Sequence, residues 1–314
     1  MSTFNRESTA EEVVGGLDLS GQVFVITGTS SGLGEESARV LAGRGARIAM
    51  LARNAEANQE AADRIRSSVP DADLTMHRLD LSDLASVERF AAEAADRLDR
   101  IDVLMNNAGV MACPLARTAD GFEMQFGTNH LGHFALTGRL LPLLRQAESP
   151  RVVTVSSGGH RICDVDLDDP DFEHTPYDPW AAYGRSKSAN IHFAAELARR
   201  FGPDLVSLSL HPGAIPTNLG RHMTDEMMEA MSARIKASSS SGQGYQYKTL
   251  ESGAATQVWA ATAPELADHN GKYLADCNLA EPGTDETGYA PHIYNPSTEA
   301  ALWELSERLV ELSF

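Results

Sequence analysis

Tyr183 and Lys187 are the two residues whose types and spacing most directly suggest chemistry. They stand four positions apart, and residues four apart lie on one face of a helix. A tyrosine has a pKa near ~10, but an adjacent lysine cation favours the phenolate and makes the phenol a usable acid or base near neutral pH. Reduction of a ketone needs such a proton donor. Because this spacing is also common by chance, its meaning depends on the rest of the chain.

A glycine-rich turn near the N-terminus has the composition of a phosphate-binding loop. Residues 27–34 read Thr-Gly-Thr-Ser-Ser-Gly-Leu-Gly. Glycines let a backbone turn tightly and approach a pyrophosphate, which a helix N-terminus attracts through its free N–H groups and its dipole. The same residues can also form a simple turn. Their position between the first expected strand and the first expected helix favours a dinucleotide site.

The elements that would position these residues alternate along the chain. Apolar, β-branched runs are separated by longer segments rich in Ala, Leu, Glu and Arg, which is the pattern of βαβ units. The expected strands are 23–27, 47–51, 74–79, 103–106, 152–156 and 205–210, with a seventh at 272–275. The expected helices are 33–44, 55–68, 84–98, 121–145, 181–201, 253–261 and 296–312.

We therefore expect an α/β fold of the Rossmann type, with a doubly wound, mostly seven-stranded parallel sheet and helices on both faces. No clear linker divides the chain, so residues 19–314 are predicted to form a single dinucleotide-binding and catalytic domain. Residues 1–18 are predicted to be a mobile N-terminal extension. Residues 163–179 and 214–248 fit the strand–helix rhythm poorly and are predicted to be insertions that shape a substrate site.

The composition argues against several classes of partner. The chain has 26 Lys and Arg against 44 Asp and Glu, a formal charge of −18, which disfavours nucleic acid and anionic lipid. Its three cysteines are scattered and its ten histidines form no metal-spaced motif, so no metal is expected. The sequence shows no signal peptide and no membrane span, and we expect a cytoplasmic protein.

Two further motifs follow expected strands. Asn106-Asn107-Ala108-Gly109 ends the fourth strand, and His211-Pro212-Gly213 with Thr217 follows the sixth. Together with the TGxxxGxG turn and the YxxxK pair, these motifs resemble in order and spacing those of the classical short-chain dehydrogenase/reductase family, over about residues 21–276. The resemblance implies a Rossmann fold, an NAD(P) cofactor and a small-molecule alcohol or carbonyl substrate.

The resemblance also implies a catalytic set of Asn129, Ser157, Tyr183 and Lys187. The hydroxyl of Ser157 would hydrogen-bond the substrate oxygen as charge develops there; the neighbouring Ser156 is the competing candidate. Tyr183 would transfer the proton beside Lys187, and Asn129 would hold a water that links Lys187 to solvent. An asparagine that simply bends a helix is compatible with the same position.

The cofactor-binding residues implied by the resemblance lie in loops that follow the strands. Asp80 and Leu81 would lie at the adenine ring, and Thr217 would contact the carboxamide or phosphate side of the cofactor. The whole set is Gly28, Ser30, Ser31, Gly32, Leu33, Gly34, Arg53, Asp80, Leu81, Asn107, Ala108, Gly109, Tyr183, Lys187, Pro212, Gly213 and Thr217.

Arg53 bears on which cofactor is preferred. NAD-specific folds usually carry an acidic residue at the end of the second strand, where it binds the ribose 2′-hydroxyl, but residues 50–54 read Met-Leu-Ala-Arg-Asn. The Arg53 guanidinium is suited to the 2′-phosphate of NADP; a solvent-exposed arginine without this role is the alternative. Ser30 and Ser31 stand in the phosphate loop, where many NADP-preferring relatives add a second basic residue. We predict NADP(H), with NAD(H) as the alternative.

The interval between Ser157 and Tyr183 is long for the family and rich in acidic residues. With the Ser-Lys-Ser-Ala-Asn-Ile run at 186–191 and the His-Pro-Gly turn, it resembles the branch of retinol dehydrogenases and protochlorophyllide reductases, which implies a bulky apolar substrate. An apolar stripe in the second insertion would be either a substrate lid or ordinary packing if that segment is helical. Its members are Met223, Met227, Met231 and Ile235.

The leading interpretation is an NADP-dependent alcohol dehydrogenase or carbonyl reductase. Two alternatives stay open. One is a noncatalytic dinucleotide-sensing protein on the same fold, and the other is a light-dependent reductase of the protochlorophyllide type. Helices 121–145 and 181–201 could pair with another subunit or be shielded by an insertion, so a homo-oligomer also stays open.

Overall fold

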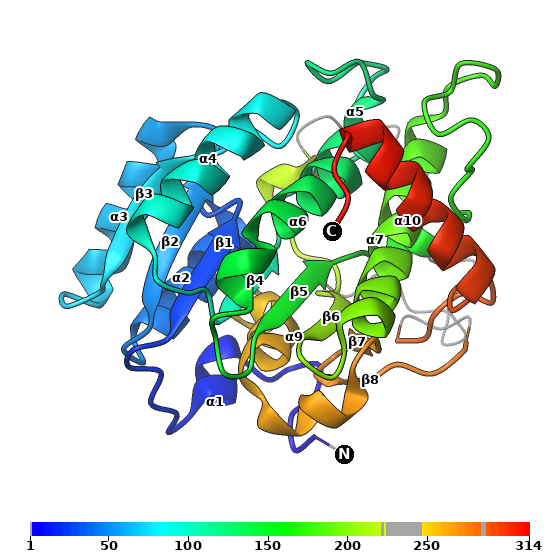
Figure 1. Ribbon diagram of the computed structural model, residues 1–314. Coiled ribbons are helices and arrows are strands. Elements are labelled where there is room, and N and C mark those ends of the chain that lie inside the picture. Colours follow the sequence, from blue (N-terminus) through cyan, green and yellow to red (C-terminus); the bar gives the residue numbers. More distant parts are fainter. Residues whose placement is uncertain (1, 221–222, 224–246, 284–286) are drawn as a thin grey trace.

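The structure, a computed structural model, describes residues 2–220, 223, 247–283 and 287–314. Its centre is an eight-stranded sheet with the order β3-β2-β1-β4-β5-β6-β7-β8 (Figure 1). The first seven strands are parallel, and β8 is antiparallel to β7. The strands are β1 Val23–Thr27, β2 Arg47–Ala52, β3 Leu74–Arg78, β4 Val103–Asn106, β5 Arg151–Val155, β6 Val206–His211, β7 Tyr273–Ala275 and β8 Asn278–Leu279.

Helices cover both faces of this sheet. The longer ones are α2 Gly32–Ala42, α3 Ala55–Ser68, α4 Leu84–Arg97, α6 Gly132–Leu144, α7 Pro179–Phe201, α9 Leu250–Thr262 and α10 Pro296–Val310. Two short helices are α1 Ala10–Val14 and α5 Met124–Phe126, and a π-helical turn, Gly127–Leu131, joins α5 to α6. The predicted α/β fold with a doubly wound, mostly parallel sheet is confirmed.

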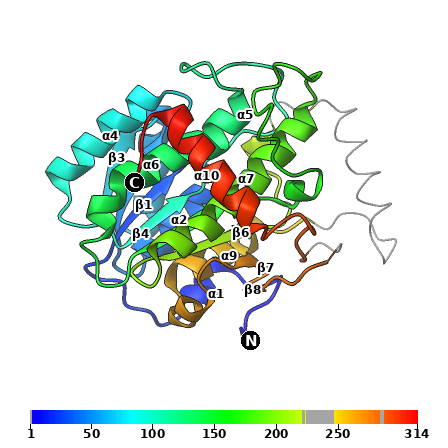
Figure 2. The ribbon, with the colours of Figure 1, turned by 45° about the vertical axis from the view of Figure 1, so that its right-hand side comes forward.

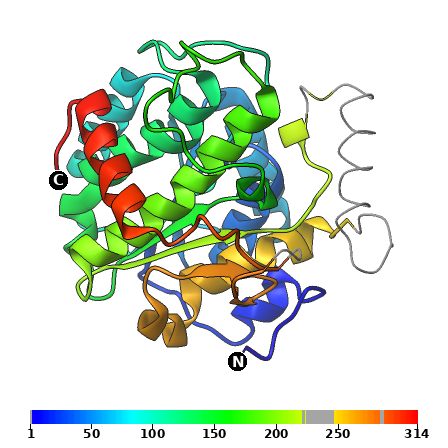
Figure 3. The same ribbon diagram turned by 90° about the vertical axis from the view of Figure 1, so that its right-hand side faces the viewer.

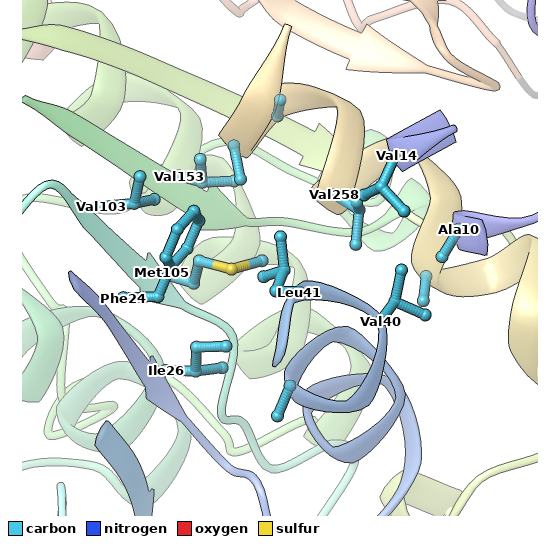
Figure 4. Close-up of a cluster of buried hydrophobic side chains, with 14 of the residues drawn as sticks. Ala10, Val14, Phe24, Ile26, Val40, Leu41, Val103, Met105, Val153 and Val258 are labelled. Carbon is cyan, nitrogen blue, oxygen red and sulfur yellow. The ribbon is translucent and has the colours of Figure 1, made fainter. Parts of the chain in front are cut away.

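Alternation along the strands divides the core into two layers. Phe24 and Ile26 of β1 belong to a cluster with α1, α2, α3 and α9, whereas Val25 between them belongs to a cluster with α4, α6, α7 and α10. Figure 4 shows the first cluster, in which Val103, Met105 and Val153 of the neighbouring strands meet Leu41 of α2 and Val258 of α9. Adjacent side chains of a strand point to opposite faces, so each strand contributes to both layers.

The parallel strands end at one edge of the sheet, which places their following loops together. Strand β1 pairs with β2 on one side and with β4 on the other, so the connections leave β1 and β4 in opposite directions. In open α/β sheets the ligand lies in the crevice beyond the strand carboxyl ends at this switch point. The glycine-rich turn follows β1 there, and residues 107–110 follow β4.

The first eighteen residues do not form a mobile extension, and that prediction was wrong. Ala10 and Val14 of α1 are fully buried and belong to the first core cluster with Val258 of α9 (Figure 4). Thr9 and Glu12 form a capping box at the start of α1. The T-x-x-E spacing is a recognised helix-start signal, so the sequence did contain evidence for this helix. The N-terminal segment also reaches β8, where Asn278 donates to the Phe4 carbonyl at 3.4 Å (Figure 2).

Two local features differ from the expected elements. The predicted helix 121–145 is instead α5, the π-helical turn and α6. The two-residue strand β8 was not predicted. Residues 163–179 form an irregular segment ahead of α7, as expected, whereas most of the second insertion, with Met227, Met231 and Ile235, lies outside the described residues.

The acidic residues of segment 163–179 mostly order the segment itself. Asp169 accepts hydrogen bonds from the backbone N–H groups of residues 173–175. Asp166 pairs with Arg185 of α7 at 3.0 Å, and Asp164 contacts His192 of α7 at 2.8 Å. Two of the acidic residues that distinguish this insertion in the sequence, Asp164 and Asp166, therefore bind it to α7.

The C-terminal helix α10 packs along α7, and in Figure 3 the red α10 lies beside the green helices. Trp303 of α10 lies with its ring centroid 5.0 Å from that of Phe134 in α6 and 5.9 Å from that of Phe193 in α7. Phe314 completes the cluster at 4.8 Å from Trp303. The surface of α6 and α7 that we considered as a possible subunit interface is therefore packed against the C-terminal residues of the same chain.

Candidate functional site

A cleft of about 290 Å³ lies at the carboxyl edge of the sheet beside β1 and β4. Thirteen of the predicted cofactor-binding residues line it: Gly28, Ser30, Ser31, Gly32, Leu33, Gly34, Arg53, Asp80, Leu81, Asn107, Ala108, Gly109 and Thr217. Tyr183, Lys187, Pro212 and Gly213 are not among the lining residues. The structure thus brings five separate loops together around one groove.

The glycines of the first loop are required by close backbone contacts. Gly28 has φ +75°, and a Cβ there would lie 2.9 Å from the Cα of Ala108. A Cβ on Gly34 would collide with the carbonyl oxygen of Gly28. Gly32 has φ +66° and faces Thr217, whose Cγ2 would lie 3.6 Å from its Cβ. At Gly28 and Gly34 a side chain would collide with neighbouring protein atoms, so glycine is what allows the loop to turn this tightly beside the cleft.

The N-terminus of α2 presents backbone N–H groups to this cleft. Ser31 is the N-cap residue of α2, and its side chain makes no capping hydrogen bond. Glu35 in the first turn would repel an anion, but Arg64 of α3 binds its carboxylate at 2.7 Å. Arg64 also approaches the Ser30 carbonyl at 3.4 Å. The N-terminus of α2 can therefore still attract an anion, although Glu35 lies in its first turn.

Thr27 joins the glycine loop to the loop after β4. Its Oγ1 accepts the backbone N–H groups of Asn107 and Ala108, both at 2.9 Å. The ring of His133 in α6 lies with Nε2 2.9 Å from Thr27 Oγ1 and Nδ1 2.9 Å from the carbonyl oxygen of Asn129. A carbonyl can accept but not donate, so Nδ1 carries the hydrogen and the Thr27 hydroxyl donates to Nε2. Burial lowers the pKa of His133 to about 4 and keeps this ring neutral.

Arg53 and Asp80 lie on the part of the cleft next to β2 and β3. Arg53 is exposed and follows Ala52, the last residue of β2; none of the described residues that line the cleft at this strand end is acidic. Asp80 accepts hydrogen bonds from the backbone N–H and the hydroxyl of Ser82, at 3.0 and 2.6 Å. Its carboxylate is thereby held in the loop after β3.

Tyr183 and Lys187 lie on one buried face of α7, as their spacing predicts. The Lys187 ammonium nitrogen is 5.8 Å from the centroid of the Tyr183 ring and donates to the carbonyl oxygen of Val155 at 3.0 Å. Tyr183 and Lys187 are each 3% exposed. Burial lowers the pKa of Lys187 to about 7, so both its charged and neutral forms are populated near neutral pH.

Asn129 lies in the π-helical turn and connects the loop after β4 to α7. Its Nδ2 donates to the Val110 carbonyl at 2.9 Å and to Ser186 Oγ at 3.0 Å, and its Oδ1 accepts the Val110 N–H at 2.8 Å. A Cβ on Gly109 would lie 3.2 Å from Asn129 Oδ1 and 3.6 Å from Lys187 Nζ. The side chains of Asn129 and Lys187 therefore both lie close to Gly109, which lines the cleft. A π-helical turn is a frequent feature of functional sites.

The two adjacent serines after β5 face different surroundings. Ser156 is 2% exposed and donates to the backbone carbonyl of Lys187 at 2.8 Å. Ser157 is half-buried, and its Oγ accepts the backbone N–H of Gly159 at 3.0 Å. A Cβ on Gly159 would lie 2.7 Å from the Tyr183 ring and 3.5 Å from Ser157 Oγ. Ser157, not Ser156, is thus on the side of the Tyr183 ring.

The Pro-Gly turn after β6 is fixed by a residue that the sequence did not single out. Gly213 has φ +94°, and the stem of Lys248 packs against it at 3.0 Å from the position of a Cβ. Lys248 forms a buried ion pair with Asp276, at 2.5 Å, beyond the end of β7. The turn is thereby tied to β7, while Thr217 further along reaches the cleft.

Several residues of the cleft were missed by the sequence interpretation. Leu51, Ala52 and Asn54 line it beside Arg53, and Met124 and Thr128 line it from α5 and the π-helical turn. Asn54 also caps α3 by accepting the N–H of Ala57, a signal that was readable in the sequence. Met124 and Thr128 reach the cleft because of the π-helical turn, and a turn of this kind leaves no recognisable hydrophobic pattern in the sequence.

The described residues contain neither a cluster of metal ligands nor a helix suited to a membrane. No group of three or more His, Cys, Asp or Glu there could hold a metal ion. Among the same residues, no helix combines the length and the apolar character needed to cross a membrane.

Comparison with known proteins places the chain in a family. The family profile for short chain dehydrogenases matches residues 22–228. Human retinol dehydrogenase 14 is 38% identical over 308 residues, which cover 94% of this chain and 88% of that protein. The crystal structure of an uncharacterized protein from Mycobacterium Paratuberculosis has a TM-score of 0.74 and 36% identity, covering 96% of this chain and 98% of that one. The Pseudomonas aeruginosa RhlG/NADP active-site complex has a TM-score of 0.62 and 29% identity, covering 82% and 94%.

The doubly wound sheet, the glycine loop at its switch point and the Tyr–Lys helix define an oxidoreductase on a dinucleotide-binding fold. The chain belongs to the short-chain dehydrogenase/reductase family, in its retinol dehydrogenase-like branch. Members of this family bind NAD(P)(H) and act on small molecules.

Proposed function

We propose that this protein is an NADP(H)-dependent oxidoreductase that interconverts a primary or secondary alcohol and its aldehyde or ketone on a bulky apolar substrate. The observation that carries this proposal is that four side chains form two pairs, which Tyr183 and Lys187 connect on one face of α7. Asn129 and Lys187 lie at Gly109, which lines the cleft, and Ser157 and Tyr183 lie at Gly159.

The residues of the cleft fit a dinucleotide. Gly28, Gly32 and Gly34 line the cleft without side chains, and the backbone amides at the start of α2 lie next to them. The pyrophosphate would lie on these groups, and the adenine ring near Asp80 and Leu81. A bound cofactor of this kind supplies the hydride for carbonyl reduction or accepts it in alcohol oxidation.

The chain's own residues would manage the proton and the charge on the substrate oxygen. Tyr183 would donate a proton to that oxygen during reduction and accept it during oxidation. The Ser157 hydroxyl already accepts the Gly159 N–H, which leaves its own hydrogen free to bond the substrate oxygen. Lys187, when charged, favours the phenolate form of Tyr183. Asn129 holds the loop after β4 against α7 and would support the water that restores the proton.

The preference for NADP(H) rests on Arg53. Its guanidinium is exposed at the cleft, next to the end of β2, and the described part of the chain places no carboxylate in the cleft there. A guanidinium binds a 2′-phosphate well, whereas an NAD-specific site would place a carboxylate near the ribose. The related Pseudomonas aeruginosa structure is named as an NADP complex, which supports the same choice.

The proposed substrate class rests on the relatives and on one aromatic residue. Relatives in this branch are named retinol dehydrogenases. Trp180 at the start of α7 is partly exposed, and its ring lies 6.4 Å from that of Tyr183. An indole beside the proton donor offers apolar surface to a large substrate.

A panel of carbonyl substrates with both cofactors tests the proposal. All-trans-retinal would represent bulky apolar aldehydes and cyclohexanone small ketones, with oxidation of NADPH and NADH followed in the dark. We expect turnover in the dark, with higher kcat/KM for NADPH and for the bulky aldehyde. Tight NADPH binding without turnover of any carbonyl would instead indicate a noncatalytic dinucleotide-binding protein, and turnover that requires light would indicate the photochemical alternative.

A further inference from the structure

His160 lies between the turn that carries Ser157 and a C-terminal segment far away in sequence. It belongs to the 3-10 turn Gly158–Arg161 that follows Ser157, and it is fully buried. Its Nδ1 is 2.6 Å from the carbonyl oxygen of Ser157, and its Nε2 is 3.2 Å from the backbone nitrogen of Ala290. The edge of its ring meets Tyr273 of β7, with centroids 5.2 Å apart.

These two contacts fix the tautomer of the ring. The Ser157 carbonyl can accept but not donate, so Nδ1 carries the hydrogen; the Ala290 N–H donates, so Nε2 carries the lone pair. Both requirements are met by one neutral tautomer. Burial, together with the facing Arg161, His211 and His292, lowers the pKa of His160 to about 3, although its hydrogen bond to the Ser157 carbonyl acts in the opposite direction. The ring therefore stays neutral through the ordinary pH range.

The Ser157 carbonyl receives two hydrogen bonds from the same residue. The backbone N–H of His160 donates to it at 3.1 Å, in addition to the ring N–H. These bonds hold the backbone of Ser157 while its Oγ accepts the Gly159 N–H. Because Gly159 packs against the Tyr183 ring, the same turn sets the position of the serine relative to the tyrosine.

On the side away from Ser157, the His160 ring contacts the segment 287–293 through Ala290. Ala290 and Ile293 in this segment are buried and pack with Ile191 and Tyr273. A second bond ties the segment to the turn, because Arg161 donates to the Gly288 carbonyl at 2.7 Å. The turn that carries Ser157 is thus held from a part of the chain that does not line the cofactor cleft.

We propose that His160 is a positioning residue for catalysis, which orients the Ser157 hydroxyl toward the substrate oxygen by clamping the Ser157 carbonyl to the segment 287–293. The inference rests on the proposed function. His160 acts through Ser157 and does not touch the reacting atoms. Its loss is expected to lower kcat while leaving the cofactor cleft intact, because Thr27, the glycine loop and Arg53 lie outside this turn.

Substitutions at His160 separate positioning from general structural support. His160→Leu removes both ring contacts and is expected to lower kcat about tenfold or more, with the Kd for NADPH changed less than twofold. His160→Asn can return an N–H near the place of Nδ1 and should recover much of kcat, whereas His160→Gln places its amide nearer Nε2 and should not.

His130→Leu is the matched control: His130 is an equally buried histidine, but its Nε2 contacts Ser306 of α10 at 2.8 Å. It should lower Tm comparably without the same loss of kcat.

A double-mutant cycle with Ser157→Ala supplies the decisive readout. If His160 acts through the serine hydroxyl, His160→Leu should cost little further kcat once Ser157 is alanine. An equal loss in both backgrounds, or recovery by Gln and not by Asn, would overturn the inference. If His160→Leu does not fold, the Asn and Gln variants still decide it. A wild-type protein that binds NADPH but turns over no carbonyl would refute the proposed function itself, whereas an active wild type with unchanged kcat in His160→Leu would refute this inference alone.

Discussion

The side-chain nitrogen of Lys187 lies 3.0 Å from the carbonyl oxygen of Val155, the last residue of β5. This hydrogen bond joins α7 to the end of β5, and the Lys187 side chain is buried between the helix and the sheet. Desolvation disfavours its charge and lowers its pKa from 10.5 to about 7. The residue that we propose helps to ionise Tyr183 is therefore one whose own charge is costly to maintain.

The shifted pKa of Lys187 predicts a pH-dependent effect on stability. Between pH 7 and 10.5 the unfolded state binds more protons at this residue than the folded state, so this group's contribution to the free energy of unfolding rises with pH in that window. Below pH 7 the cost of burying the charge is present in full. Lys187→Met removes that cost and should raise Tm by roughly 5 °C more at pH 6 than at pH 10.

Differential scanning calorimetry of the cofactor-free protein checks this. Lys272→Met is a suitable control because Lys272 is exposed and should show no such difference between the two pH values. An equal effect of Lys187→Met at both pH values would show that the lysine keeps an ordinary pKa.

The two serines after β5 predict different kinetic effects. Ser157→Ala removes a hydrogen bond that strengthens as the substrate oxygen gains charge, a loss of roughly 3 kcal/mol or about 10²-fold in kcat. Ser156→Ala removes a bond to the Lys187 backbone and should mainly lower Tm. Steady-state kinetics on variants with normal NADPH binding decide between them. The opposite ranking would assign the catalytic role to Ser156.

Arg53→Asp should reverse the cofactor preference. It removes the cation expected to bind the 2′-phosphate and places a carboxylate where NAD-specific folds carry one. The ratio of the Kd values for NADH and NADPH, measured by calorimetry, should fall by about tenfold or more. Arg308→Asp makes the same change of charge at an exposed position of α10 and should leave the ratio alone. Equal affinities for both cofactors in the wild type would be incompatible with the proposed role of Arg53.

Coverage of α6 and α7 by α10 predicts that this surface does not form a subunit interface. Light scattering after size exclusion should give no dimer built on these helices. Trp303→Ala leaves a cavity among Phe134, Phe193 and Phe314, and it should cost about 3–5 kcal/mol of stability and cause concentration-dependent association. Leu279→Ala, at a partly exposed position in β8, should do neither. Cross-links between copies through α6 or α7 in the wild type would contradict this reading.

The sequence predicted the sheet well because the signal is local. Most of the seven parallel strands are apolar runs, and each of the seven lies within a residue of its expected place. The capped helix at Ala10–Val14 was missed, although Thr9 and Glu12 form its capping box, because the segment does not fit the alternation of strands and helices. Strand β8 has only two residues, too few for any alternation to appear.

The candidate site was predictable only in part for the same reason. Tyr183 and Lys187 share one helix, and the glycine loop is continuous, so their spacing reveals them. His133, which contacts Thr27, and His160, which contacts Ala290, act through partners more than a hundred positions away. No pattern in a single sequence records such pairs, because the sheet and its loops bring them together only after folding.

The most direct measurement of the central claim is the turnover of Tyr183→Phe. This change removes the transferable proton and keeps the ring that packs against Gly159. We predict a loss of about 10²-fold or more in kcat for reduction of a bulky apolar aldehyde, with the Kd for NADPH and the Tm close to those of the wild type. A near-normal kcat in this variant, measured on folded protein with intact NADPH binding, would contradict the assignment of Tyr183 as the acid/base.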